Sequence, residues 1–326
     1  MKASPAFEFP PEQQRALRKA RRLEWLTIGY LLTVVLAMYL VLGSSQAMKT
    51  AWLEDVLSLV PPIVFLVANR IAGWHPTERF PYGYHRVTSI AFLCAALALL
   101  TMGLWLLGDA TYKLATAERP TIAGITLFGN TIWLGWLMLP VLLWSAAPAF
   151  LLGRAKLPLA RCMHDKVLYT DADMNKADWM TAVAAMTGVI GVGLGFWWTD
   201  AVAAMAISLS VTRDGFSNLR EVITNLMDET PKSTDRSRFD PLPAQIQDFV
   251  KQLPWVADAQ VRMREEGHVC FGEVFVVISD ATDLVNRLSA ATQQCAELDW
   301  RVHDIVLVPV ASLDALPCRE EPARGQ

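Results

Sequence analysis

The chain has 326 residues, of which 53% are hydrophobic, and its mean hydropathy is +0.29. This composition is too apolar for an ordinary soluble protein and predicts membrane-spanning helices. The formal net charge of −3 gives no reason to expect a nucleic-acid partner. The five cysteines are scattered without a CxxC pair, so they predict neither a disulfide framework nor a zinc knuckle.

The predicted elements begin with a basic segment, residues 1–22, which we expect to stay in the cytoplasm. Residues 23–228 then form a predicted membrane domain of six helices, because a run of about 20 apolar residues is long enough to span a bilayer. The spans lie at about 23–43, 50–74, 87–107, 122–152, 175–198 and 201–211, the last extending to 227 as an amphipathic helix. The predicted inner connectors, such as residues 154–166, are rich in Lys and Arg. Both chain ends are therefore predicted to be cytoplasmic.

The remainder of the chain reads as soluble. Residues 229–243 hold three prolines among polar residues and predict a linker. Residues 244–312 predict a small cytoplasmic α+β domain, in the order helix, strand, strand, helix, strand. The helices are expected at 245–253 and 283–298, and the strands at 257–263, 271–278 and 302–310. Residues 313–326 are predicted to be a disordered tail.

An acidic stretch opens the fifth predicted span. On a helix Asp171, Met174, Asn175 and Asp178 share one face, because they are three, four and seven residues apart. Ionisable groups at membrane depth are costly and indicate a functional site. Asp171 and the neighbouring Asp173 could instead mark only the helix start, where acids suit the helix dipole. That alternative fits Asp178 poorly, because it lies two turns further in.

The second predicted span is also acidic and contains a proline pair. Glu54 and Asp55 lie near its start and could cap the span or bind an ion. Pro61 and Pro62 follow within it and predict a kink that frees backbone carbonyls.

Three local stretches, in their order and spacing, resemble the cation diffusion facilitator family of metal transporters. Residues 45–48, Ser-Gln-Ala-Met, resemble the family's approach to the second helix, nine residues before Glu54. Residues 82–86, Tyr-Gly-Tyr-His-Arg, resemble its aromatic-Gly signature, with His85 where a second Gly usually stands. Residues 227–229, Met-Asp-Glu, resemble the acidic ending after helix six. The resemblance covers roughly residues 20 to 310.

The resemblance implies a divalent metal cation efflux transporter that exchanges cations for protons. The family binds its ion with two residues spaced four apart on helix two and two on helix five, usually His or Asp. The mapped positions here are Glu54, Ser58, Met174 and Asp178. A rotation by one residue would offer Asp55 instead, or Asp171 together with Asn175. Such an oxygen-rich set lowers the preference for zinc relative to manganese or iron(II).

The family's soluble domain often binds further metal and forms a dimer. The candidates in this chain are His268, Cys270, Glu273, Asp283 and His303, with no tight cluster in the sequence. We therefore expect a homodimer whose soluble domain lacks those sites. No cofactor is expected besides the transported zinc, manganese or iron.

The resemblance implies a multi-pass protein of the bacterial inner (plasma) membrane, with divalent cations, protons and the bilayer as partners. An alternative is a transport-inactive member of the same fold that serves as a metal sensor or partner subunit, since Ser58 and Met174 are unusual ligands. A membrane enzyme is disfavoured because no nucleophile–base pair or phosphate-binding Gly loop is present.

Overall fold

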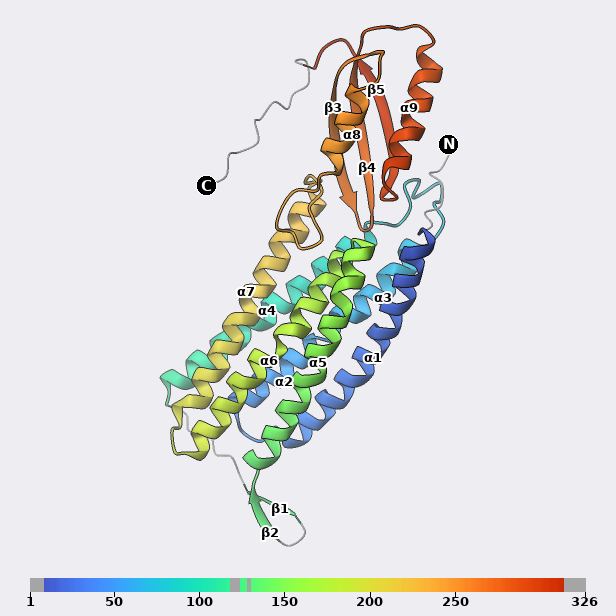
Figure 1. The fold of residues 1–326 in the computed structure, drawn as a ribbon. Coiled ribbons are helices and arrows are strands. Elements are labelled where there is room, and N and C mark those ends of the chain that lie inside the picture. Colours follow the sequence, from blue (N-terminus) through green and yellow to red (C-terminus); the bar gives the residue numbers. More distant parts are fainter. Residues whose placement is uncertain (1–8, 118–123, 128–129, 314–326) are drawn as a thin grey trace.

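The computed structural model describes residues 9–117, 124–127 and 130–313. Long helices form an elongated bundle, with a small α+β domain at one end and a two-stranded hairpin at the other (Figure 1). The bundle helices are α1 (Pro11–Val41), α2 (Gln46–Leu57), α3 (Val60–Ala72), α4 (Val87–Ala115), α5 (Gly135–Met163), α6 (Lys166–Gly193) and α7 (Trp198–Leu226). Residues 1–8 of the basic segment and residues 314–326 of the predicted tail lie outside the described residues.

Among the described residues, four stretches of the bundle are long and apolar enough to cross a membrane. These are α1, the α2–α3 pair, α4 and α5. Helices α6 and α7 have 28 and 29 residues, comparable to α4 and α5, and pack against them along the bundle. A helix of that length spans roughly 40 Å, which exceeds the hydrocarbon thickness of a bilayer. The bundle therefore has the dimensions of a multi-pass membrane domain.

The predicted fourth span, residues 122–152, is wrong at both ends. Strands β1 (Gly124–Leu127) and β2 (Asn130–Trp133) pair antiparallel, and α5 begins only at Gly135. At the other end α5 continues to Met163, so most of the predicted basic loop at residues 154–166 is helical. Lys156, one of the basic residues on which that predicted loop rested, is fully buried between helices.

The predicted second span is two helices joined by a short break. Ser58 is the residue that ends α2, and α3 starts two residues later with Pro61 and Pro62 in its first turn. Proline suits this position because the first helical residues have no N–H bond to lose. Broken backbone at membrane depth is tolerated where protein surrounds it, and Ser58 is buried. The break therefore places a polar side chain inside the bundle.

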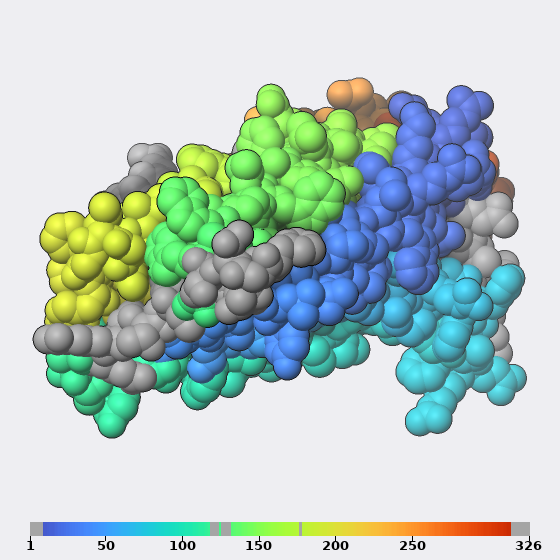
Figure 2. Space-filling view, turned by 90° about the horizontal axis from the view of Figure 1, so that it is seen from below, coloured from blue at the N-terminus to red at the C-terminus, as the bar shows by residue number. Residues whose placement is uncertain are grey.

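Helices α4 and α7 lie side by side along the bundle (Figure 1). Seen from the hairpin end, the yellow turn between α6 and α7 lies beside the end of α4 at one edge (Figure 2). The approach is close, since a Cβ at Gly215 of α7 would lie 2.7 Å from the Leu100 Cα of α4. A glycine is therefore required at this crossing.

The C-terminal domain is an α+β unit, and its predicted order of elements is confirmed. It comprises α8 (Leu242–Lys251), β3 (Val256–Glu266), β4 (Val269–Ile278), α9 (Leu284–Leu298) and β5 (Val302–Val310). The strands follow the order β3–β4–β5, with β3 antiparallel and β5 parallel to β4. Its core includes Ile246 and Val250 of α8, Val274 of β4 and Cys295 of α9. The start of α1 lies at the same end of the bundle as this domain (Figure 1).

Candidate functional site

Helix α2 is anchored at its first turn by a buried acid of α7. Ser45 caps α2 by accepting a hydrogen bond from the Met48 N–H, and its hydroxyl donates to Asp200 Oδ1 at 2.5 Å. The backbone N–H of Gln46 donates to Asp200 Oδ2, also at 2.5 Å. Asp200 thus satisfies helix donors that would otherwise lack partners. This contact fixes the position from which the acids of α2 project.

The two adjacent acids of α2 face different helices. Thr181 of α6 donates its hydroxyl hydrogen bond to Glu54 Oε1 at 3.1 Å. Ser145 of α5 lies 3.2 Å from both carboxylate oxygens of Asp55. Neighbouring helical residues are about 100° apart around the axis, so the two carboxylates diverge. Glu54 is therefore the acid that faces α6.

Helix α6 presents its acidic stretch on one buried face, as its spacing predicts. Asp171, Asn175 and Asp178 are buried, Met174 is half-buried, and Asp173 is exposed. The Asp178 carboxylate interacts electrostatically with Glu54 and, more weakly, with Asp55. Carboxylates so placed repel each other unless a cation or protons offset their charge.

Four buried oxygen atoms along these two helices have no hydrogen-bond donor among the described residues. They are Glu54 Oε2, Ser58 Oγ, Asn175 Oδ1 and Asp178 Oδ2. A buried acceptor without a partner costs about 1–3 kcal/mol, so four together indicate a ligand that supplies positive charge. Asn175 uses its amide nitrogen to donate to the Asp171 carbonyl at 2.9 Å, which leaves its oxygen available. The set combines two carboxylates, a hydroxyl and an amide oxygen.

Two of the residues proposed from the sequence have other surroundings. Asp171 is bound by the ammonium of Lys156, and Met174 packs in part against the apolar core of the bundle. Within the described ranges, no three His, Cys, Asp or Glu side chains converge to hold a metal ion. The oxygen set on α2 and α6 therefore depends on Ser58 and Asn175 as well as on its acids.

A polar cavity of about 570 Å³ lies between α6 and α7 and reaches Met174. Its far side is formed by the segment after α7, through Glu229, Lys232 and Arg236. Asp214 of α7 lines it and interacts electrostatically with Glu54. Its other lining residues are Tyr169, Thr170, Asp173, Ser217, Asn218, Arg220, Glu221, Thr224 and Asp235. The cavity thus extends from the segment after α7 to Met174, the neighbour in sequence of Asn175.

The structure also contains buried charges that the sequence did not single out. Lys156 Nζ donates to Glu24 Oε2 at 2.8 Å and to Asp171 Oδ2, and all three side chains are buried. Glu24 interrupts a predicted apolar span, and the cost of a charge there is the signal that could have found it. Lys156 gave no such signal, because it stood among basic residues expected in a loop.

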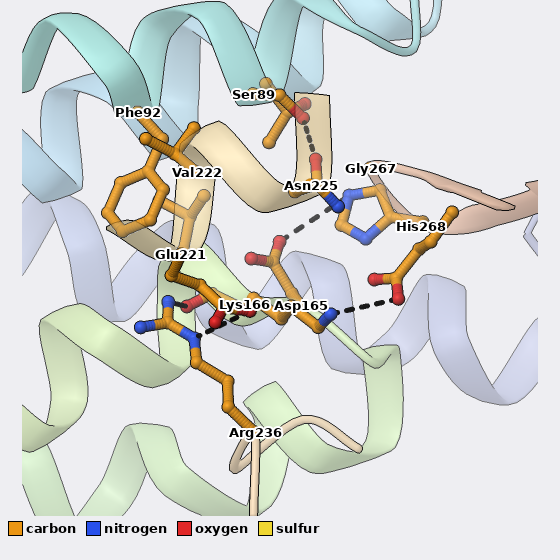
Figure 3. A pocket seen from close by; sticks show the side chains of 13 residues that line it. Ser89, Phe92, Asp165, Lys166, Glu221, Val222, Asn225, Arg236, Gly267 and His268 are labelled. Atoms are coloured by element: carbon orange, nitrogen blue, oxygen red, sulfur yellow. Dashed lines mark hydrogen bonds and ion pairs between the residues drawn. The ribbon is translucent and has the colours of Figure 1, made fainter. Parts of the chain in front are cut away.

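The tip of the β3–β4 hairpin docks onto the membrane helices around a small pocket of about 40 Å³ (Figure 3). Lys166 of α6 forms an ion pair with Glu265 at 3.0 Å, and His268 Nε2 lies 3.5 Å from Asp165 Oδ2. His268 Nε2 also lies 3.0 Å from Asn69 Oδ1 of α3. A space of this size holds one or two waters, so the feature is a joint between domains rather than a substrate pocket.

Within the described residues, the metal candidates proposed for the soluble domain do not gather into one site, although His268 and His303 both lie near His85. Glu273 is bound by Arg262, and Asp283 accepts a hydrogen bond from Asn286 at 2.7 Å. Burial raises the pKa of the Cys270 thiol, which disfavours a metal-binding thiolate. His303 lies against His85 of the α3–α4 connector, with ring centroids 5.2 Å apart. Together with His268 at the hairpin tip, these side chains belong to different local structures.

Residues 25–227, more than half of the chain, match the family described as the cation efflux transmembrane domain. The chain belongs to the cation efflux, or cation diffusion facilitator, family. This membership makes it a multi-pass integral membrane transporter, not an enzyme, and implies a metal cation as its substrate.

Several curated relatives are similar to this chain over part of its length. The manganese efflux system protein MneS of Bacillus subtilis (strain 168) is 26% identical over 208 residues, which are 60% of this chain and 67% of the relative. The magnetosome protein MamB of Magnetospira sp. (strain QH-2) is 21% identical over 188 residues, 58% of this chain and 60% of the relative. The uncharacterized transporter YdbO of Bacillus subtilis is 22% identical over 222 residues, 67% of this chain and 71% of the relative.

Proposed function

We propose that this protein exports a divalent cation that binds between α2 and α6, in exchange for protons. The observation that carries the proposal is the set of four buried oxygens without hydrogen-bond donors among the described residues. Glu54 and Asp178 supply two negative charges, which balance one divalent cation. Ser58 and Asn175 complete the set with neutral oxygen donors, and residues from two facing helices can replace a hydration shell.

The donors favour a hard cation such as manganese(II) or iron(II). Carboxylate, hydroxyl and amide oxygens suit these ions, whereas zinc sites in proteins usually contain His or Cys. The family resemblance maps a ligand onto Met174, but the proposed ligand is its neighbour Asn175, which supplies an amide oxygen instead of a thioether sulfur. Similarity to a protein named for manganese efflux points to the same ion. Because the two helices offer four oxygen donors that lack hydrogen-bond partners among the described residues, a transport-inactive sensor or partner subunit is the weaker interpretation.

The polar cavity between α6 and α7 is the proposed entrance for the cation. Its acids Asp173 and Asp214 attract cations, and Asp214 interacts electrostatically with Glu54. The cavity opens toward the end that holds the C-terminal domain and the basic start of α1. By the positive-inside rule we place that end in the cytoplasm of a bacterial inner membrane. The C-terminal domain is the proposed dimer contact.

Proton exchange follows from the charges of the emptied site. Once the cation leaves, Glu54 and Asp178 remain as two buried carboxylates in a medium of low dielectric constant. Burying such charges without compensation is costly, so protons take the place of the cation. An inward proton gradient would then drive outward cation movement.

The proposal is tested by Mn²⁺ uptake into proteoliposomes with and without a proton gradient. Asp178→Asn is expected to abolish uptake, whereas Asp109→Asn on α4 is the control. Asp109 lies in a membrane helix but pairs with Lys49 and Lys113 away from the site. Uptake by Asp178→Asn at the wild-type rate would contradict the assignment, and uptake that ignores the gradient would contradict proton exchange.

Ser58→Ala distinguishes a ligand from a structural hydroxyl. Because Ser58 Oγ has no donor among the described residues, its removal is expected to leave the stability of the protein unchanged or slightly higher. If the hydroxyl binds the cation, the KM for Mn²⁺ rises. An unchanged KM would remove Ser58 from the site.

A further inference from the structure

A second group of charges is buried between α1, α5 and α6. Lys156 of α5 is 0% exposed, and its ammonium binds the carboxylates of Glu24, 0% exposed, and Asp171, 1% exposed. The distance from Lys156 Nζ to Glu24 Oε2 is 2.8 Å. The arrangement is a cation held between two carboxylates that come from different helices.

Two carboxylates share one ammonium in this group. If both are ionised, one negative charge is left inside the bundle, and a proton or a cation must offset it because uncompensated buried charge is costly. Glu24 Oε1 is buried and has no hydrogen-bond donor in the part of the chain that the structure describes. A divalent cation would balance both carboxylates, whereas the ammonium balances only one.

We propose that Glu24 and Asp171 form a second divalent-cation site, which the ammonium of Lys156 fills in place of the ion. The inference rests on the proposed function in one respect, namely that the transported substrate is a divalent cation. Lys156 thereby confines that substrate to the site at Glu54 and Asp178. Carboxylates of two helices, brought together around a positive charge, are the chemistry that hard divalent cations require.

This group lies close to Asp178, which explains why it should not bind a second divalent cation. Asp171 and Asp178 lie on one face of α6, seven residues apart, which is about 10 Å along the axis. Both Asp171 and Lys156 interact electrostatically with Asp178. A divalent ion at Asp171 would repel a divalent ion at Asp178 more strongly than the singly charged ammonium of Lys156 does. Unlike that ammonium, the ion would not be covalently attached to the protein.

The experiment counts Mn²⁺ ions bound to purified full-length protein in detergent, from the electron paramagnetic resonance signal of free Mn²⁺. Lys156→Met keeps the length of the side chain and removes the charge. It is expected to bind one Mn²⁺ more per chain than the wild type. Lys156→Met combined with Asp171→Asn, the matched control, is expected to return to the wild-type number. Equal numbers for wild type and Lys156→Met would overturn the proposal.

A second measurement applies if Lys156→Met folds poorly. Mn²⁺ is then expected to raise the melting temperature of Lys156→Met more than that of Lys156→Met with Asp171→Asn, because only the former retains both carboxylates. Equal shifts would also overturn the proposal. Adding Asp178→Asn to Lys156→Met separates the two sites. The combined variant is expected to keep the additional ion bound at Glu24 and Asp171. If Asp178→Asn alone binds as much Mn²⁺ as the wild type, the proposed function is refuted, but the comparison of Lys156→Met with Lys156→Met and Asp171→Asn still tests the second site.

Discussion

His85, in the connector between α3 and α4, predicts a specific loss of stability at acid pH. The side chain is 6% exposed, and burial, followed by the nearby His303 and His268, lowers its pKa from 6.5 to about 4. The unfolded chain therefore binds a proton more readily than the folded chain between these pH values. The contribution of His85 to stability is present above pH 6.5 and is lost as the pH falls below it.

The size of this loss follows from the two pKa values. One pKa unit corresponds to about 1.4 kcal/mol. When the pH falls from about 7.5 to about 5, the free energy of unfolding should therefore fall by about 2 kcal/mol through His85 alone. Unfolding of the detergent-purified protein by heat or denaturant at both pH values measures it. His85→Gln should lose about 2 kcal/mol less than the wild type over this range.

The control is His75→Gln, which changes an exposed histidine of the same connector. It should show the pH dependence of the wild type. If His85→Gln and the wild type lose the same stability on acidification, the buried neutral state of His85 is refuted.

Three further predictions concern the frame of the site and its ion. Asp200→Asn replaces one acceptor oxygen by an amide N–H2 donor that faces the donors of Ser45 and Gln46, so it should lower stability by about 1–3 kcal/mol, read as a lower melting temperature. Gly267→Ala should destabilise the hairpin tip by roughly 1–2 kcal/mol, because φ is +67° and a Cβ would lie 3.2 Å from the His85 carbonyl oxygen; faster proteolysis of the hairpin would report it. Met174→His should leave the competition between Mn²⁺ and Zn²⁺ in transport unchanged, because Met174 packs in part against the apolar core and the proposed ligand is Asn175. A shift toward Zn²⁺, which imidazole favours, would show that residue 174 reaches the ion.

The spacing of apolar and polar residues correctly predicted those elements that bury one face. The C-terminal domain was predicted in the correct order because its strands and helices alternate apolar and polar positions. The buried face of α6 was predicted because Asp171, Asn175 and Asp178 recur at helical spacing. The start of the fourth span was wrong because the residues of the β1–β2 hairpin are about as apolar as a membrane helix, so hydropathy cannot separate them.

The remainder of the site depends on packing between helices that are distant in the sequence. The sequence alone does not say which of the adjacent acids Glu54 and Asp55 faces α6. The structure does, because Glu54 contacts Thr181 of α6 and Asp55 contacts Ser145 of α5. The partner of Asp171 comes from α5, so no pattern within α6 could reveal that it is bound by Lys156. Asp200 likewise acts on a distant part of the chain, because it accepts hydrogen bonds at the start of a helix more than 150 residues earlier.

The most direct test of the cation site is a structure of the full-length protein with Mn²⁺ bound, in which anomalous scattering locates the ion. One ion is expected between α2 and α6, in contact with Glu54 and Asp178, with Ser58 and Asn175 as further oxygen ligands. The same crystals should show no ion beside Lys156. An ion bound instead at Asp55 or Asp171, or the absence of any ion between α2 and α6 at saturating Mn²⁺, would contradict the assignment.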